Sequence, residues 1–227
     1  MNFEQVKEAA DFEKAKDEIC FRFVGKYWDS KKPRERVTLD FLDLKVEFYI
    51  PVTLDNSTRM GSGTVTKELA EIWGKDAESL WEYAKLNTPR MFPAKVKELI
   101  DVLLEYNPQF LQETDNESLK DGGIPLIEVS NEQGLYGAAV ILYDGILEGL
   151  AKELDSDLFI LPSSVHATVI APEKELVDDP PLAEMIRSTN KKFTSTENVL
   201  SDSVYRFERG KGIVLEGHKD ESGLLLL

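Results

Sequence analysis

The region between residues 137 and 172 carries the densest apolar patterning in the chain, and it constrains the fold most. Four apolar residues near its start recur every three or four positions: Ala139, Leu142, Ile146 and Leu150. That spacing is typical of a helix with one apolar face and predicts a helix over residues 138–154. A second interpretation stays open, in which a strand over residues 138–143 is followed by a helix that begins after an Asp144 N-cap.

Two glycines interrupt this predicted helix. Gly145 and Gly149 are four positions apart, so they lie on the same surface of a helix. Glycine inside a helix is less favourable than alanine by roughly 1 kcal/mol, so its presence needs a reason. We expect a neighbouring backbone to pack closely against both positions.

The second half of the region predicts two strands. Residues 158–161 (LFIL) form a short apolar run, and residues 167–171 (ATVIA) form another. Pro162 between them cannot donate a hydrogen bond to a sheet, so it marks a strand end or a bulge. We therefore expect a hairpin, or one bent strand, around residues 162–164.

The same segment contains the candidate catalytic residues Ser163, Ser164 and His166. On an extended backbone Ser164 and His166 point to the same face, and a serine beside a histidine is the pairing of a nucleophile and its base. However, no Gly-x-Ser-x-Gly elbow surrounds the serines, and no third group is in place to orient the imidazole. The structural interpretation, in which the hydroxyls bind turn backbone groups and the histidine makes a structural hydrogen bond, has the stronger support.

The charge balance is strongly acidic. Lys and Arg number 27 against 42 Asp and Glu, which gives a formal charge of −15. Such a field repels phosphate backbones, so we expect no direct binding to nucleic acid. Plain solubility explains the charge, and the alternative is an acidic mimic of nucleic acid that binds a basic partner. The one basic cluster, residues 26–36, predicts a solvated loop, with an anion site as the other interpretation.

Other features indicate a cytoplasmic protein without a cofactor or metal. Cys20 is the only cysteine, so no internal disulfide can form and a buried free thiol in a reducing compartment is expected. The first twenty residues contain no signal peptide, and no apolar run reaches the ~20 residues that span a membrane. Two distant histidines and one cysteine make no zinc signature.

Residues 61–64 are glycine-rich, as in a phosphate-binding loop. They lack the Gly-Lys-Ser/Thr ending of a Walker motif, so they predict a turn before a helix cap.

The rest of the chain predicts an α+β domain. Residues 44–54 alternate as a half-buried strand should. Further strands are expected near residues 19–24, 124–129 and 203–215. Helices are expected over residues 1–18, 77–86, 93–104, 182–190 and 194–200, and another runs from the glycine-rich turn to about residue 73. The helix after Asp76 is stopped by residues 87–89, and Thr194 with Glu197 makes a capping box. The expected fold is one antiparallel sheet with helices on one face. The expected division is an N-terminal helix (1–18), one domain (19–207), and a C-terminal strand and tail (208–227).

Six segments carry a resemblance to a known family: FLDLKVEFYI, ELAEIWG, ESLWEYAKLNTPRMFP, GAAVILYDGILEGLA, LFILPSSVHATVIAP and ENVLSDSVYRF. In this order they are similar to bacterial domain-of-unknown-function family 5688, over roughly residues 19–207. More distantly, the segments around Trp73 and residues 136–150 resemble the uncharacterised YtpQ-type family. In family 5688 an acidic residue usually follows the histidine, whereas here Ala167 follows it, which weakens a Ser-His-acid interpretation. The resemblance implies a bacterial cytoplasmic setting and no known activity, cofactor or catalytic residue.

These observations favour a non-enzymatic binding or protein-interaction module. Its expected contact surface is the exposed aromatic side of Trp73, Trp81 and Tyr83. The alternatives are a hydrolase-like enzyme that uses Ser163 or Ser164 with His166, and the acidic mimic described above. The sequence is compatible with a protein partner. It does not specify the ligand or the oligomeric state.

Overall fold

The computed structural model describes residues 11–25, 36–53, 60–108, 124–162, 164–176 and 182–215. The strands are β1 (Cys20–Val24), β2 (Thr38–Phe41), β3 (Leu44–Thr53), β4 (Met60–Thr64), β5 (Ala94–Glu98), β6 (Ile127–Asn131), β7 (Leu158–Leu161), β8 (Thr168–Pro172), β9 (Tyr205–Glu208) and β10 (Gly212–Leu215). The α-helices are α2 (Phe12–Ala15), α3 (Lys67–Trp73), α4 (Ala77–Met91), α5 (Leu99–Tyr106), α8 (Ile146–Glu153) and α9 (Leu182–Phe193), and two 3-10 helices are η2 (Gly137–Leu142) and η3 (Glu173–Glu175).

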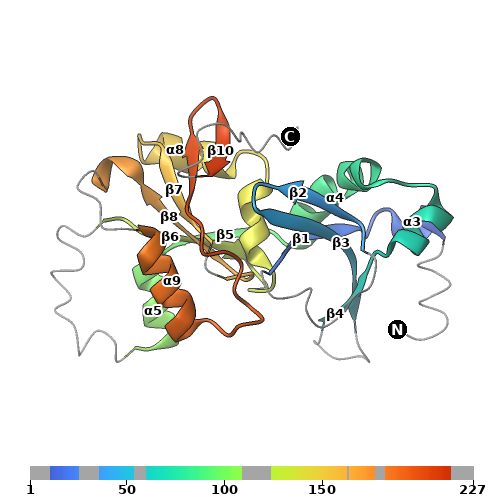
Figure 1. Ribbon diagram of the computed structural model, residues 1–227, viewed down its shortest axis with the longest axis horizontal. Helices are drawn as coiled ribbons and strands as arrows, with labels where there is room; N and C mark the ends of the chain where they lie inside the picture. Colours follow the sequence, from blue (N-terminus) through green and yellow to red (C-terminus); the bar gives the residue numbers. More distant parts are fainter. Residues whose placement is uncertain are drawn as a thin grey trace.

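The strands form two antiparallel sheets, which lie at opposite ends of the elongated molecule (Figure 1). In the first sheet β3 pairs with β1, β2 and β4. The second sheet has the order β10-β9-β7-β8-β6-β5. The predicted α+β class is therefore confirmed, although the strands are divided between two sheets.

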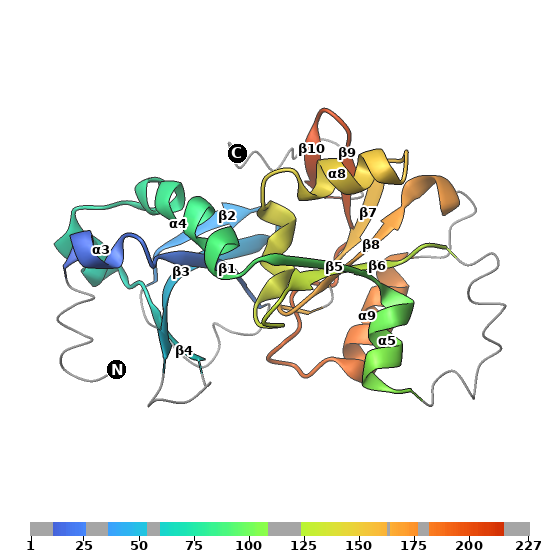
Figure 2. The ribbon, with the colours of Figure 1, turned by 180° about the vertical axis from the view of Figure 1, so that it is seen from behind.

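Helices cover both faces of the second sheet. Successive residues of a strand point to opposite faces. Ile160 of β7 belongs to the core cluster that includes Leu147 of α8, whereas Phe159 packs in the cluster that includes Ile186 of α9. Helices α8 and α9 therefore lie on opposite faces, and Figure 2 shows α5 beside α9.

One continuous core joins the two sheets, and η2 lies at its centre. All six residues of η2 are buried, and the helix contacts both β1 and β6. A Cβ atom on Gly137, the first residue of η2, would lie 2.3 Å from Ser130 Oγ and 2.6 Å from the carbonyl oxygen of His166. This close approach is what requires glycine there.

Both interpretations of residues 138–154 are wrong. The first part, Gly137–Leu142, is the 3-10 helix η2 and so is neither α-helix nor strand. A turn then separates η2 from α8, so the segment is not one continuous helix. Gly145 has φ 78°, a left-handed conformation that favours glycine. A Cβ atom at Gly145 or Gly149 would meet nothing within 4 Å, so the close packing expected there occurs at Gly137 instead.

Helix α4 continues past Pro89, where we predicted its end. The side chains of the two preceding residues bind the segment around β1. Asn87 Nδ2 donates to the carbonyl oxygen of Ile19 at 3.1 Å, and the amide of Phe21 donates to Thr88 Oγ1 at 3.0 Å. These tertiary bonds hold the last turn in place although the proline lacks an N–H.

The helix predicted from Pro93 begins later. Residues 94–98 form strand β5, which pairs with β6 through Ala94↔Asn131 and Val96↔Val129, and α5 follows at Leu99. The apolar spacing fits a helix, but pairing with a neighbouring strand decided the conformation.

Three smaller predictions are also corrected. Residues 60–64 form strand β4 instead of a turn, although Thr66 does cap α3 by accepting from the amide of Leu69 at 3.2 Å. Residues 196–198 form a turn where a short helix was expected. Strand β3 is buried on both faces, since Glu47 is only 1% exposed.

The predicted aromatic contact surface is wrong. Trp73 and Trp81 are 8% and 4% exposed and belong to the core cluster. Tyr83 packs edge-on against Phe12, which in turn contacts Trp73. These rings stabilise the fold around α2 and α4, and of the three only Tyr83 is partly exposed.

Several predictions fall on residues outside the described ranges. Of the helix predicted over residues 1–18, residues 11–18 are described, and within them the helix α2 is limited to Phe12–Ala15 and begins after its extended cap Asp11. Of the basic cluster only Arg36 is described, and the tail beyond residue 215 lies outside. Within the described part of the chain, no helix is long and apolar enough to cross a membrane.

Candidate functional site

The predicted serine–histidine segment makes structural hydrogen bonds. Ser163 lies outside the described residues. The Oγ of Ser164 accepts from the backbone amide of His166 at 3.1 Å, and the Nδ1 of His166 accepts from the amide of Tyr136 at 3.2 Å. Both groups therefore satisfy backbone donors, as the structural interpretation expected, and the hydrolase hypothesis stays a prediction.

The environment of His166 favours its neutral form. Its ring is half-buried and lies 5.7 Å from the Tyr136 ring, measured between centroids. Burial lowers the pKa of the imidazole below its ordinary value, while a hydrogen bond with Asn198 opposes this shift. A neutral Nδ1 is the form that accepts the Tyr136 N–H.

A buried ionic cluster lies in the first sheet. Glu47 Oε1 accepts from Arg22 Nε at 2.7 Å, and Glu47 Oε2 accepts from Arg36 NH1 at 2.7 Å. The Arg22 guanidinium also lies over the rings of Tyr49 and Tyr136, at 4.7 Å and 4.2 Å from their centroids. This cluster packs β1 against the turn before η2, and its charged groups are buried and bind one another, so we assign it to stability.

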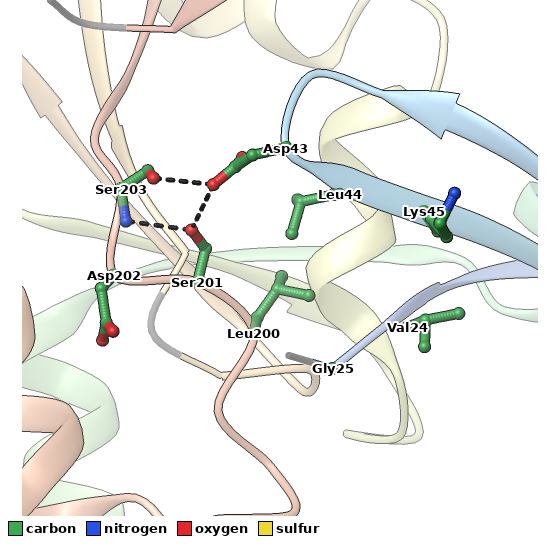
Figure 3. A pocket seen from close by; sticks show the side chains of 9 residues that line it. All are labelled: Val24, Gly25, Asp43, Leu44, Lys45, Leu200, Ser201, Asp202 and Ser203. Carbon is green, nitrogen blue, oxygen red and sulfur yellow. Dashed lines mark hydrogen bonds between the residues drawn. The ribbon is translucent and has the colours of Figure 1, made fainter. Parts of the chain in front are cut away.

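A pocket of about 290 Å³ opens where the two sheets meet (Figure 3). Its polar lining residues are Asp43, Lys45, Ser201, Asp202 and Ser203, and its other lining residues are Val24, Gly25, Leu44 and Leu200. One wall comes from the end of β1 and the β2–β3 turn, and the other from the segment before β9. The pocket is therefore built from parts of the chain about 160 residues apart.

Asp43 is the polar centre of this pocket. Its Oδ2 accepts from Ser203 Oγ at 2.7 Å and from Ser201 Oγ at 3.1 Å, and its Oδ1 accepts from the hydroxyl of Tyr205. The two-residue turn that presents Asp43 holds Leu42 at φ 53°, which is strained for a branched residue. Three hydroxyl donors thus hold this turn against the second sheet.

The opposite wall is held by hydrogen bonds to the backbone of Pro162 and from the side chain of Asn190 in α9. The amide of Ser201 donates to the carbonyl oxygen of Pro162 at 3.2 Å. Asn190 Nδ2 donates to the carbonyl oxygen of Ser201 at 2.9 Å and to Asp202 Oδ1 at 2.8 Å. Helix α9 therefore positions residues 201 and 202 independently of Asp43.

The charges around the pocket do not neutralise Asp43. Its three partners are neutral hydroxyls, and among the described residues no Lys, Arg or His forms an ion pair with it. The Lys45 ammonium lies 2.5 Å from Asp40 Oδ1, and in Figure 3 it is turned away from Asp43. Asp43 is exposed to solvent, so a ligand can reach it.

The sequence contained no signal that joins the two walls. Asp43 follows a leucine in a short turn, and residues 201–203 (SDS) read as an ordinary polar loop. Only the docking of the two sheets brings them together. Nor do the described residues hold a group of three or more His, Cys, Asp or Glu side chains that could bind a metal ion.

Comparisons with known proteins agree with the resemblance found in the sequence. No curated protein and no solved structure matches the chain. The more distant resemblance to the YtpQ-type family is not supported by these comparisons. One family matches residues 1–209, beyond the 19–207 that the sequence segments indicated. The chain therefore belongs to the family of unknown function DUF5688.

Proposed function

We propose that this protein is a non-enzymatic binding protein and that the pocket around Asp43 is its binding site. The observation that carries the proposal is the pocket itself, in which the hydroxyls of Ser201 and Ser203 hold the Asp43 carboxylate in a fixed position at the wall of the cavity. Ligand sites are typically preformed cavities with apolar walls and a few placed polar groups.

The size of the pocket limits the ligand. Cavities for drug-sized molecules and cofactors occupy roughly 300–1,000 Å³. At about 290 Å³ this pocket lies at the lower end of that range. It suits a small metabolite or one side chain of a partner protein better than a nucleotide.

The chemistry of the lining supports binding more than catalysis. The lining residues that the structure describes include no imidazole and no thiol. The hydroxyls of Ser201 and Ser203 donate to Asp43, which is a weak base for activating a serine. These groups therefore serve to hold and orient the carboxylate.

We also infer a bacterial cytoplasmic setting without direct binding to nucleic acid. The resemblance noted in the sequence implies a bacterial source, and the charge of −15 opposes contact with phosphate backbones. Cys20 is fully buried, and burial raises the pKa of its thiol to about 12. Such a thiol stays protonated and unreactive, which fits a reducing compartment.

A fragment screen by saturation-transfer NMR tests the pocket assignment. The full chain would be screened against small amines, alcohols, amides and carboxylates, and every hit repeated with Val24→Trp. Val24 lines the pocket at the end of β1 and is partly exposed, so a larger ring there fills the cavity. We expect the hits to lose their signal with this variant.

The matched control is Val96→Trp, the same change at an exposed position of β5 outside the pocket lining. Both variants must show the circular dichroism and melting transition of the wild type. A screen in which every hit binds Val24→Trp as well as it binds the wild type would overturn the assignment.

A further inference from the structure

We propose that the pocket around Asp43 binds a primary amine on a short apolar chain, with the Asp43 carboxylate as its counter-ion. This inference rests on the proposed binding function and names the ligand class. The amine can belong to a small molecule or to a lysine side chain of a partner, and the experiment below separates these sources.

The hydrogen bonds of Asp43 leave room for one more donor. A carboxylate has about four acceptor positions, and here three are taken by hydroxyls. All three donors are neutral, so they orient the group without cancelling its charge. An ammonium supplies both the missing donor and the missing positive charge.

The remaining lining fits a short hydrocarbon chain. Val24, Leu44 and Leu200 provide apolar surface beside the carboxylate. Asp202 also lines the pocket, but its carboxylate accepts from Asn190 and is turned away from Asp43 in Figure 3, and the Lys45 ammonium binds Asp40. The charge of Asp43 therefore favours a cationic ligand.

Other ligand classes fit less well. An anion would lie beside the uncompensated charge of Asp43, which is unfavourable at short range. Among the described residues the lining contains no aromatic side chain, so these residues offer a nucleobase no ring on which to stack. A neutral alcohol could take the vacant acceptor position but would leave the charge without a partner.

Calorimetric titration of the full chain with three probes tests the proposal. The probes are 1,5-diaminopentane, the uncharged analogue 1,5-pentanediol, and a lysine capped at both backbone ends. We expect the diamine to bind at least tenfold more tightly than the diol. Binding of the diamine alone indicates a small-molecule ligand, whereas tighter binding of the capped lysine indicates a partner's side chain.

Three variants assign the effect to Asp43. Asp43→Asn removes the charge and should weaken diamine binding at least tenfold. Asp101→Asn removes one exposed charge from α5 and should change binding less than twofold. Ser203→Ala removes a neutral donor that orients Asp43 but keeps the carboxylate charge, so it should weaken diamine binding less than Asp43→Asn does.

The outcomes separate this inference from the proposed function. Equal affinity for the diamine and the diol, or unchanged diamine binding by Asp43→Asn, overturns the amine assignment. If Val24→Trp still abolishes binding in those cases, the pocket remains the binding site for a different ligand. If no probe binds and Val24→Trp abolishes no fragment hit, both proposals fail.

Discussion

The hydroxyl of Tyr205 donates a hydrogen bond to Oδ1 of Asp43, a residue 162 positions earlier in the chain. Tyr205 is fully buried in the second sheet, whereas Asp43 lies in the β2–β3 turn of the first. Burial raises the pKa of the phenol, and the bond to Asp43 adds to the shift, so the hydroxyl stays protonated and donates. The bond fixes the first sheet against the second and shapes the pocket.

Tyr205→Phe and Asp43→Asn should therefore be coupled. Hydrogen bonds to charged acceptors contribute about 1.5–3 kcal/mol, and residues in contact show coupling energies of about 0.5–3 kcal/mol. We expect a coupling near 1 kcal/mol between the two substitutions, measured by urea unfolding of both single variants and the double variant. Additive losses in the double variant would show that the bond does not hold the sheets together.

Glu47→Gln should be severely destabilising. The single carboxylate of Glu47 binds two arginines in the interior of the first sheet, and removing its charge leaves more uncompensated positive charge there. Breaking a buried pair in this way costs about 3–5 kcal/mol. Urea unfolding measures the loss, and Glu82→Gln, which breaks an exposed pair with Lys85, should cost less than about 1 kcal/mol. Similar losses for the two variants would contradict the assignment.

The stability of the protein should fall as His166 becomes protonated. Its folded pKa lies below the unfolded value near 6.5, so the unfolded chain binds more protons between the two values. Stability is therefore complete above about pH 6.5 and decreases as the pH drops below that value. Urea unfolding from about pH 5 to 8 follows this change.

His166→Asn provides the comparison for this pH dependence. The asparagine oxygen can accept the Tyr136 N–H in place of Nδ1 but does not titrate. We expect a smaller change of stability with pH in this variant. An NMR titration would also give the pKa of His166 directly, and a value at or above 6.5 would be inconsistent with burial of the neutral ring.

Alanine at Gly145 and Gly149 should have opposite effects. Gly145 adopts φ 78°, where alanine is strained, so Gly145→Ala should destabilise by about 1 kcal/mol. Gly149 lies inside α8 with open space around it, so Gly149→Ala should stabilise by about 0.5–1 kcal/mol. Thermal unfolding of both variants measures the difference. If both substitutions destabilise the protein, the result would instead support the close packing around both glycines that was expected from the sequence.

The hydrolase hypothesis predicts that a labelled serine-reactive phosphonate modifies Ser163 or Ser164. We expect no labelling, because the Ser164 hydroxyl and His166 Nδ1 both accept from backbone amides. Mass spectrometry of the treated protein provides the measurement. Labelling that disappears in both Ser164→Ala and His166→Asn would support an enzyme instead of a binding module.

Local signals determined much of the secondary structure. Alternation predicted β3, and the cap at Asp76 placed the start of α4. A hairpin was one of the two arrangements expected for β7 and β8, and strands were expected where β9 and β10 lie. These features depend on residues close in sequence, where the side-chain period and the capping hydrogen bonds are decisive.

Tertiary structure decided what the local patterns left ambiguous. Strand pairing with β6 made residues 94–98 extended, and a left-handed Gly145 separated η2 from α8. The pocket had no local signal at all, since Asp43 and Ser203 are ordinary turn residues until the two sheets dock. The sequence by itself determined an acidic α+β chain of this family. Its candidate site arises only from contacts across about 160 residues, because no local period or motif records such distances.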